Sequence, residues 1–359
     1  MEIDPAARER HEKLAKLAGR PAPKWQFTSP AEFFGAVHET EIGGPRDQRL
    51  IMAAISGAGE GAGVEGGFLV PDPVSASLWE ATYAVSQILR RCERQPLTTS
   101  SKLTIPAISE SSRAAGSRFG GVVMNWVSEG EAPTETIPKF RAIHFALKKL
   151  LGIAYATGEL VNDAPAFEAH LRRVFSLEAA HTLDEALIRG SGAGEPLGAL
   201  NSDALISVQK ESGQAANTVL PENLINMALR LWPPSHMRAR WYVGPGVFGQ
   251  IAGAQFANGT PVIEYAAGER FVLGLPLELT EHTLALGSKG DILLADFSQT
   301  LVTEQSPEFI GSIHVRFLEH ENCFRFRFRA DAAPAWAEPI TLENTAATVS
   351  PYVALDERS

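Results

Sequence analysis

VNDAPAFEAHLRRVFSLEAAHTLDEALIRGSGAGEPLG, residues 161–198, holds the most regular pattern in the chain. Asp163 is a favourable N-cap residue, and Pro165 is tolerated in the first turn of a helix. Gly190 suits the left-handed position that follows a helix C-terminus. The residues between them repeat apolar side chains at helical spacing, so they predict one long amphipathic helix. Its apolar stripe consists of Leu171, Val174, Phe175, Ala179, Leu183, Ala186 and Leu187.

A long strand is predicted just before this helix. Between Ala142 and Thr157 the apolar side chains alternate with a period of two, including Ile143, Phe145 and Ile153. Such a strand exceeds the usual length of about five or six residues. We therefore favour a ribbon that projects onto a neighbouring molecule, with a long strand inside an ordinary sheet as the alternative. Shorter strands are predicted at residues 103–105 and 122–127.

The segments after the helix predict short helices and strands. We expect a helix at residues 221–232 that Pro233 and Pro234 break, and a strand at residues 241–243 that a Gly-Pro-Gly turn ends. Near the C-terminus three phenylalanines alternate with three arginines, which predicts a strand with one apolar and one basic face. Those six residues are Phe324, Arg325, Phe326, Arg327, Phe328 and Arg329. We favour a solvated or protein-facing role for the basic face over DNA binding. The chain is predicted to be an α+β protein without repeats.

The first part of the chain differs in composition from the rest. Residues 4–19 predict a polar helix, which is either solvated or pairs with another chain. Glycine is dense in residues 57–67, which favours a mobile linker because ordering glycine has a high entropic cost. A phosphate-binding loop is the alternative, but it requires a Gly-Lys-Ser/Thr ending, and this stretch has no Lys or Arg.

Composition limits the classes of function. The 359 residues suffice for one large domain or two modest ones, and 45% hydrophobic with 21% charged residues is typical of a folded globular protein. The net charge of −10 disfavours binding to the phosphate backbone of a nucleic acid. Two distant cysteines, Cys92 and Cys323, fit a reducing cytoplasm. We expect neither a signal peptide nor a membrane span, which needs an apolar run of about 20 residues.

Common catalytic motifs are missing from the sequence. It has no Gly-x-Ser-x-Gly, His-Glu-x-x-His, Cys-x-x-Cys or suitably placed Gly-x-Gly-x-x-Gly motif. His170 and His181 could share a helix face, but no third metal ligand stands near them in the sequence. We therefore expect no catalytic, cofactor-binding or metal-binding residues, and no cofactor.

Five segments in order resemble the Hong-Kong-ninety-seven type of tailed-phage major capsid protein, across roughly residues 64–337. The resemblance rests on GGFLVP at 66–71, VNDAP at 161–165, GSGAGEPLG at 190–198, FVLGLPL at 271–277 and GDILLADFS at 290–298. It implies the phage major capsid fold, with the following division of the chain. The expected parts are an N-terminal scaffold-like segment and Gly-rich linker (1–65), an N-arm (66–96), an extended β-ribbon loop (97–160), a peripheral domain with its spine helix (161–200), an axial domain (201–292), peripheral strands that return to the axial domain (293–340) and a C-terminal tail (341–359). Many members carry a longer scaffolding segment than residues 1–65, so a separate scaffold is one expectation and a sufficient short segment the other.

The resemblance also implies a function. The chain is expected to be a structural subunit, not an enzyme, that assembles with itself into hexamers, pentamers and an icosahedral shell. That shell would enclose double-stranded DNA without binding it specifically. Scaffold, portal and decoration proteins are possible partners, a membrane is not, and assembly is expected in the bacterial host cytoplasm. The alternatives are an encapsulin-like compartment, a prophage or gene-transfer-agent capsid, and an unrecognised α+β hydrolase or binding protein.

Covalent cross-linking of the shell is not expected. In the family's cross-linked form, a Lys on the extended loop joins an Asn of the peripheral domain, with a buried Glu as base. The loop tip reads SEGEAP at 128–133, and the first Lys after it is Lys139. The region where the Asn should fall reads SPEFIGS at 306–312, and the next Asn is Asn322.

Overall fold

A computed structural model describes residues 72–97, 102–108, 110–114, 117–127, 135–157, 164–316, 321–345 and 347–358. The chain divides into two compact units. The described part of the first unit lies within residues 72–85, 149–179 and 306–329, and that of the second within 86–148, 180–305 and 330–358. The expectations for the helix at 4–19 and the glycine-rich stretch at 57–67 lie outside the described residues.

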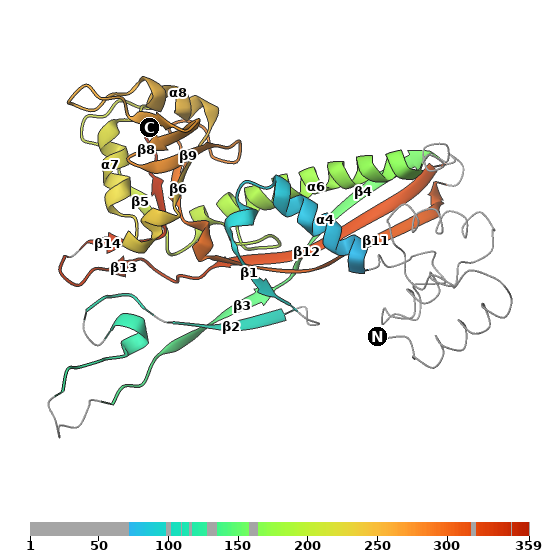
Figure 1. Ribbon diagram of the computed structural model, residues 1–359, viewed down its shortest axis with the longest axis horizontal. Coiled ribbons are helices and arrows are strands. Elements are labelled where there is room, and N and C mark those ends of the chain that lie inside the picture. The colour runs from blue at the N-terminus through green and yellow to red at the C-terminus, as the bar shows by residue number, and fades with distance from the viewer. Residues whose placement is uncertain are drawn as a thin grey trace. The chain divides into compact units, whose positions relative to one another are not determined.

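The described elements run as follows along the chain (Figure 1). The α-helices are α4 (Asp72–Val85), α6 (Ala164–Arg189), α7 (Pro221–Leu229) and α8 (Pro245–Gly253). The short 3-10 helices are η1 (Leu89–Arg91), η2 (Arg118–Gly121), η3 (Ala199–Asn201), η4 (Pro233–Met237) and η5 (Phe297–Gln299). The strands are β1 (Glu93–Pro96), β2 (Lys102–Ile108), β3 (Phe140–Ala146), β4 (Lys148–Thr157), β5 (Ile206–Val208), β6 (Arg240–Val243), β7 (Ile263–Ala266), β8 (Glu269–Val272), β9 (Leu275–Leu279), β10 (Ile292–Ala295), β11 (Thr300–Arg316), β12 (Glu321–Pro334), β13 (Ile340–Thr341), β14 (Thr348–Val349) and β15 (Tyr352–Leu355).

Helix α6 confirms the long helix that the sequence predicted. It ends at Arg189. Gly190 does not have the left-handed conformation that the sequence predicted, and glycine is required there because a Cβ would clash with the carbonyl oxygens of Ala186 and Pro196. The carboxylate of Glu195 closes the following loop by accepting from the backbone N–H of Ser191, at 2.9 Å. That bond lowers the pKa of Glu195. Most of the predicted stripe is buried, but Val174 is 44% exposed.

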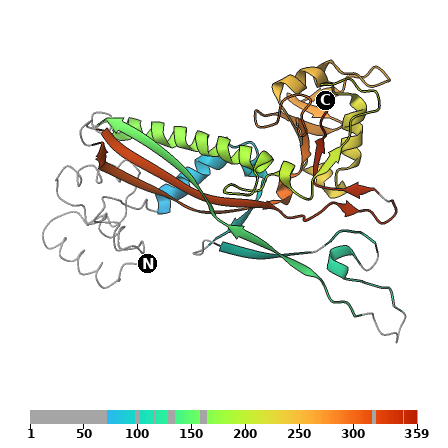
Figure 2. The ribbon, with the colours of Figure 1, turned by 180° about the vertical axis from the view of Figure 1, so that it is seen from behind.

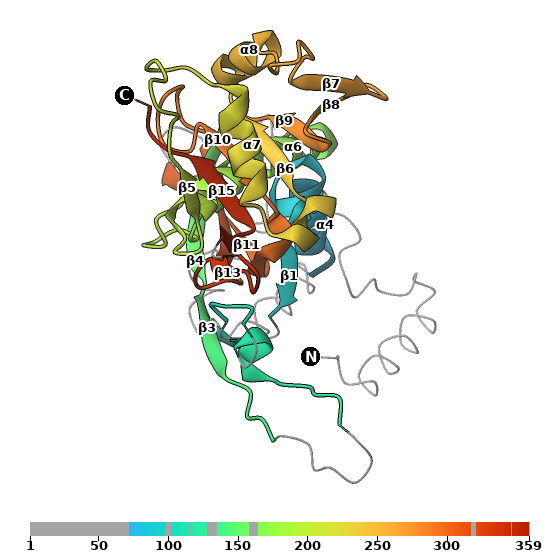
Figure 3. The same cartoon turned by 90° about the vertical axis from the view of Figure 1, so that its left-hand side faces the viewer.

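A seven-stranded sheet, in the order β5-β15-β10-β6-β9-β8-β7, forms the main core of the second unit. All four residues of β10 are buried, as expected for a central strand that is covered on both faces. Helices α7 and α8 add apolar side chains to the same core. Figure 3 looks onto this sheet, where β15 lies beside β5 and β10. The most deeply buried members, at most 1% exposed, are Leu224, Met227, Leu231, Ala239, Trp241, Val243, Val247, Ile251, Val262, Val272, Ile292, Leu294, Val353 and Leu355.

A four-stranded sheet has the order β1-β11-β12-β4 (Figure 2). Along β12 the predicted alternation is confirmed, because Phe324, Phe326 and Phe328 are all at most 5% exposed. Within the first unit, the ring of Phe326 stacks on Phe175 of α6 with centroids 3.7 Å apart. Gly152 of β4 allows this close approach, since a Cβ there would lie 2.7 Å from the Phe175 ring.

The long strand predicted over Ala142–Thr157 is broken at Leu147, and its halves join different sheets. Strand β3 pairs antiparallel with β2 in a separate ribbon, whereas β4 belongs to the four-stranded sheet. Buried Asp331 of β12 causes the break. Its carboxylate accepts from the backbone N–H of Ala146 at 2.8 Å and from the ammonium group of Lys148 at 2.5 Å. A side chain thus replaces the ladder partner at this point.

Two further predictions about secondary structure were wrong. Residues 122–127 are irregular, because no described strand forms a ladder with them. Helix α7 ends at Leu229 instead of running to 232, because Leu231 forms a β-bridge with Ser350 and the N–H of Trp232 donates to the Ser350 carbonyl at 3.0 Å. The predicted strand at 241–243 is confirmed as β6.

The stretch 341–359 was predicted to be a C-terminal tail, but it contains a central strand. Strand β15 pairs antiparallel with β10 and parallel with β5, and its four residues are fully buried. The apolar run Tyr352–Leu355 is only four residues long, which is too short to be distinguished from a tail by periodicity. Pairing with the distant strands β5 and β10 makes this run a strand.

Candidate assembly surfaces and polar anchors

The two-stranded ribbon of β2 and β3 has one covered and one open face. Ile143 and Phe145 are buried against Leu301, and partly buried apolar side chains of β2 complete this small cluster. On the other face, Thr104 and His144 are exposed and hydrogen-bonded to each other at 3.1 Å. The ribbon is therefore anchored by its apolar face, as the alternation in the sequence predicts.

Beyond the ribbon, the connection between β2 and β3 exposes large apolar side chains. Met124 is 93% exposed, Trp126 106% and Ile137 87%, and Phe140, the first residue of β3, is 65% exposed. Side chains of this size on one connection make it a candidate surface for contact with another molecule. The segment leaves the ribbon through a tight turn at Gly120, whose φ is +74° and whose Cβ would lie 2.7 Å from the carbonyl oxygen of Lys139. Only glycine fits that turn.

An apolar pocket of about 280 Å³ lies where this connection meets β13. Trp232 and Trp336 form part of its wall. Their rings pack edge to face, with centroids 5.0 Å apart and an angle of 65° between the ring planes. The guanidinium of Arg113 lies 4.7 Å from the ring centroid of Phe119. The backbone N–H of Arg113 donates to the carbonyl of Thr341 at 2.8 Å, which ties the connection to β13. The pocket is mostly apolar and suits packing better than catalysis.

Asp184 of α6 anchors the segment between α4 and β1. Its buried carboxylate accepts from the hydroxyl of Ser86 at 2.6 Å and from the N–H groups of Gln87 at 2.8 Å and Leu89 at 3.0 Å. These donors belong to the start of η1, where helix geometry leaves N–H groups without backbone partners. A carboxylate is the strongest available acceptor for them.

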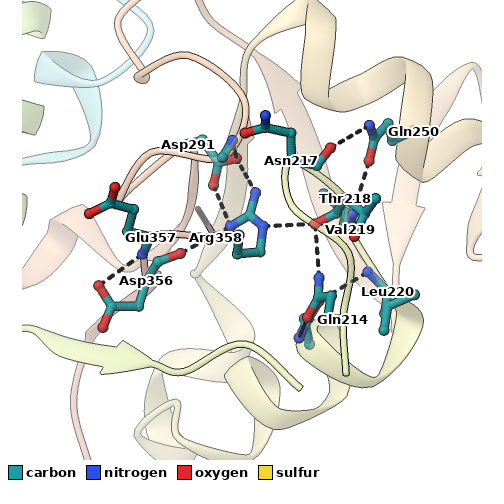
Figure 4. A network of polar contacts seen from close by, with 12 residues as sticks. Gln214, Asn217, Thr218, Val219, Leu220, Gln250, Asp291, Asp356, Glu357 and Arg358 are labelled. Atoms are coloured by element: carbon teal, nitrogen blue, oxygen red, sulfur yellow. Dashed lines mark hydrogen bonds and ion pairs between the residues drawn. The ribbon is translucent and has the colours of Figure 1, made fainter. Parts of the chain in front are cut away.

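Arg358 anchors the segment that follows β15 (Figure 4). Its guanidinium forms an ion pair with Asp291, and both side chains are fully buried. The same side chain donates to the carbonyl of Thr218 at 2.7 Å, and the backbone N–H of Asn217 donates to the carbonyl of Arg358 at 2.9 Å. Asp291 also accepts from the N–H of Gly287 at 2.9 Å. Three loops of the second unit are joined at one buried charge pair.

One group of side chains has the donor set of a metal site. His181 of α6 lies beside Glu281 and His282, which follow β9, and their potential ligand atoms lie within 4.8 Å of one another. The sequence drew attention to His170 and His181, and the side chain of His170 lies outside the described residues. The adjacent metal-ligand types Glu281 and His282 were the only sign of this group in the sequence. They lie about one hundred positions after His181, so sequence spacing did not connect them with it.

Other residues singled out in the sequence stay apart. Lys139 is exposed beside Gly120, the loop tip at 128–134 lies outside the described residues, and nothing is described of the Asn322 side chain. Cys92 is buried, and burial raises the pKa of its thiol, which leaves it unreactive. Within the described residues, no helix is long and apolar enough to cross a membrane.

Comparison with family models identifies the family of this chain, and comparison with solved structures finds proteins of similar fold. Residues 66–343 match the model of the phage capsid family. The capsid of an empty GTA particle is similar in structure, with a TM-score of 0.57 and 15% identity over 77% of this chain and 90% of that chain. The capsid of a native GTA particle gives 0.55 and 15% over 84% and 100%. A chain of Mycobacterium phage Adephagia gives 0.49 and 14% over 76% and 89%. No curated protein sequence matches significantly.

Proposed function

The chain belongs to the phage capsid family and is a major capsid protein of the Hong-Kong-ninety-seven type, and we propose that its copies form the hexamers and pentamers of an icosahedral shell around double-stranded DNA. The family is structural, so the chain is a component of a homo-oligomeric capsid and not an enzyme. The fold is the α+β capsid fold.

The parts of the subunit are assigned as follows in this proposal. Residues 1–65 are the scaffold-like segment and linker, 66–96 the N-arm and 97–160 the extended loop, which contains the β2–β3 ribbon. Helix α6 is the spine helix within 161–200. Residues 201–292 form the axial domain, and 293–340 the returning peripheral strands. Strand β15, in the former tail, is assigned to the axial domain because it pairs with β5 and β10.

The exposed apolar side chains on the connection of the ribbon carry this proposal. Trp126 and Met124 are almost completely accessible in the single subunit, and exposed apolar area of this kind is covered in an assembled protein. Burying one such side chain contributes roughly 1.5–3 kcal/mol, and a shell repeats that contact at every subunit. The extended loop is therefore proposed to lie over a neighbouring subunit.

The interior of the shell is proposed to hold DNA without gripping it. The chain carries a net charge of −10, so it repels phosphate at a distance. The net charge already includes the arginines on the basic face of β12. Scaffold, portal and decoration proteins remain proposed partners, and assembly is proposed to take place in the host cytoplasm.

Expression of the full chain, with and without scaffold, tests the proposal. Sedimentation and negative-stain microscopy should find capsomers or closed shells for the wild type and for Glu135→Ala, which removes an exposed polar side chain nearby. Trp126→Ala should retain the circular dichroism of the wild type and assemble poorly. A chain that is monomeric at high concentration under all conditions contradicts the proposal. Particles that contain protein cargo instead of DNA favour the encapsulin-like alternative.

A further inference from the structure

Two separate elements of the second unit bring three metal-ligand side chains together. His181 stands on α6, and Glu281 and His282 stand on the connection from β9 to β10. Nδ1 of His181 lies 3.2 Å from a carboxylate oxygen of Glu281. The two imidazole rings meet edge to face, with centroids 4.6 Å apart. The group lies within one unit, so its geometry is internal to that unit.

The spacing of these atoms fits a small divalent ion. Zinc binds imidazole nitrogen and carboxylate oxygen at about 2.0–2.2 Å, so two ligands of a tetrahedral ion stand roughly 3.4 Å apart. The His181–Glu281 pair at 3.2 Å already has this separation. All three potential ligand atoms lie within 4.8 Å of one another. Rotation of the exposed Glu281 and half-buried His181 side chains, which moves their ligand atoms by about 1 Å, brings all three to the separation that a tetrahedral ion requires.

The donor types select the class of ion. Two imidazoles and one carboxylate suit zinc and its transition-metal neighbours, whereas magnesium and calcium prefer all-oxygen sites. Three protein ligands leave a fourth position for water or for a group from another molecule.

Burial and charge also favour a cation here. His282 is 7% exposed, so its ring is held in place by the surrounding chain. Asp184, Glu185 and Glu281 contribute negative charge around it. Of these, Asp184 is engaged with the start of η1 and Glu185 pairs with Arg189, so Glu281 is the carboxylate that can bind.

We propose that His181, Glu281 and His282 bind one zinc ion, which fastens α6 to the β9–β10 connection. The ion would link residues about one hundred positions apart in the sequence. Binding to the folded chain alone stabilises that chain by mass action. The site is independent of the assembly proposed above, since all its ligands come from one subunit.

Zinc titration of the full chain, freed of metal by a chelator and competed against a chromophoric zinc indicator, tests this proposal. One tight site per chain is expected, with a melting temperature that rises on adding zinc and not on adding magnesium. Glu281→Gln and His282→Ala should each weaken binding at least about tenfold, the smaller loss known for groups that only support a ligand. His236→Ala, an exposed histidine elsewhere in the unit, should bind as the wild type does.

Glu281 is exposed, so Glu281→Gln should fold even if the His282 variant does not. The wild type can also be loaded with cobalt, whose visible absorption reports imidazole ligation in a four- or five-coordinate site. Equal zinc affinity in the wild type and Glu281→Gln, or cobalt spectra of a fully hydrated ion, would overturn the proposal. The three side chains would then form only an ordinary polar contact.

Discussion

Replacing Asp184 with asparagine changes one buried carboxylate to an amide of the same shape. In the wild type, one oxygen accepts from the Ser86 hydroxyl and the Leu89 N–H, and the other accepts from the Gln87 N–H. The amide of asparagine can keep one of these oxygens. Its NH₂ group then faces an N–H donor in place of the second oxygen, so two donors oppose each other in a buried site.

The magnitude follows from these contacts. Loss of a hydrogen bond to a charged group costs about 1.5–3 kcal/mol, and a buried donor left without an acceptor costs about 1–3 kcal/mol. These two contributions overlap, so we expect Asp184→Asn to lower the free energy of unfolding by about 3 kcal/mol. With a urea slope of about 3 kcal/mol/M for a chain of this size, the unfolding midpoint falls by about 1 M.

Urea unfolding of unassembled subunits, followed by tryptophan fluorescence, measures this change. Glu185→Gln is the matched control, because Glu185 is the next residue and pairs with Arg189 at the helix surface. Exposed pairs of this kind contribute about 0.3–0.5 kcal/mol. If Asp184→Asn changes the free energy of unfolding no more than this control does, the carboxylate does not anchor η1 and the reasoning is refuted.

Three further outcomes are expected. Alkali should destabilise the subunit, because burial raises the pKa of Cys92, Tyr242 and Tyr352 above their ordinary values of 9.0, 10.0 and 10.0. The unfolded chain loses these protons first, so stability is complete below pH 9 and falls as pH rises, by up to about 1.4 kcal/mol per pH unit for each group; urea midpoints that stay constant from pH 8 to pH 10.5 would disagree. Mature particles boiled in detergent should run as a single band near the monomer mass, and a ladder that survives boiling and reduction would contradict the absence of cross-links. Limited proteolysis should cut first within residues 57–67, where glycine is dense, and a first cut inside α6 would oppose this division of the chain.

Helix α6 and the alternating pattern of strand β12 could be predicted because their sequence signals are local. The caps and stripe of α6 are contained in one continuous segment, and the alternation around Phe326 requires only a period of two. The break between β3 and β4 could not be predicted in this way, because its cause is Asp331, far along the chain. Strand β15 was missed for a similar reason, since its partners are distant and its apolar run is short.

For the candidate functional residues, too, local sequence signals could be read and contacts between distant segments could not. The family could be predicted from motifs that stand in order along the sequence. The exposed Trp126 falls within residues 97–160, whose assignment as the extended loop stays a prediction. The cluster of His181, Glu281 and His282 could not be predicted, because a metal site assembled from two elements has no fixed sequence spacing. Asp184 and Arg358 were also indistinguishable from surface charges until their buried partners were located.

The position of β15 sets the order of events during synthesis of the subunit. The seven-stranded sheet has β15 between β5 and β10, so these neighbours cannot complete their hydrogen bonds until residues 352–355 have left the ribosome. Pairings between segments so far apart in the chain also form slowly. Arg358 must then reach Asp291 before the buried pair is complete. A nascent chain therefore cannot present the finished seven-stranded sheet before residue 355 has emerged.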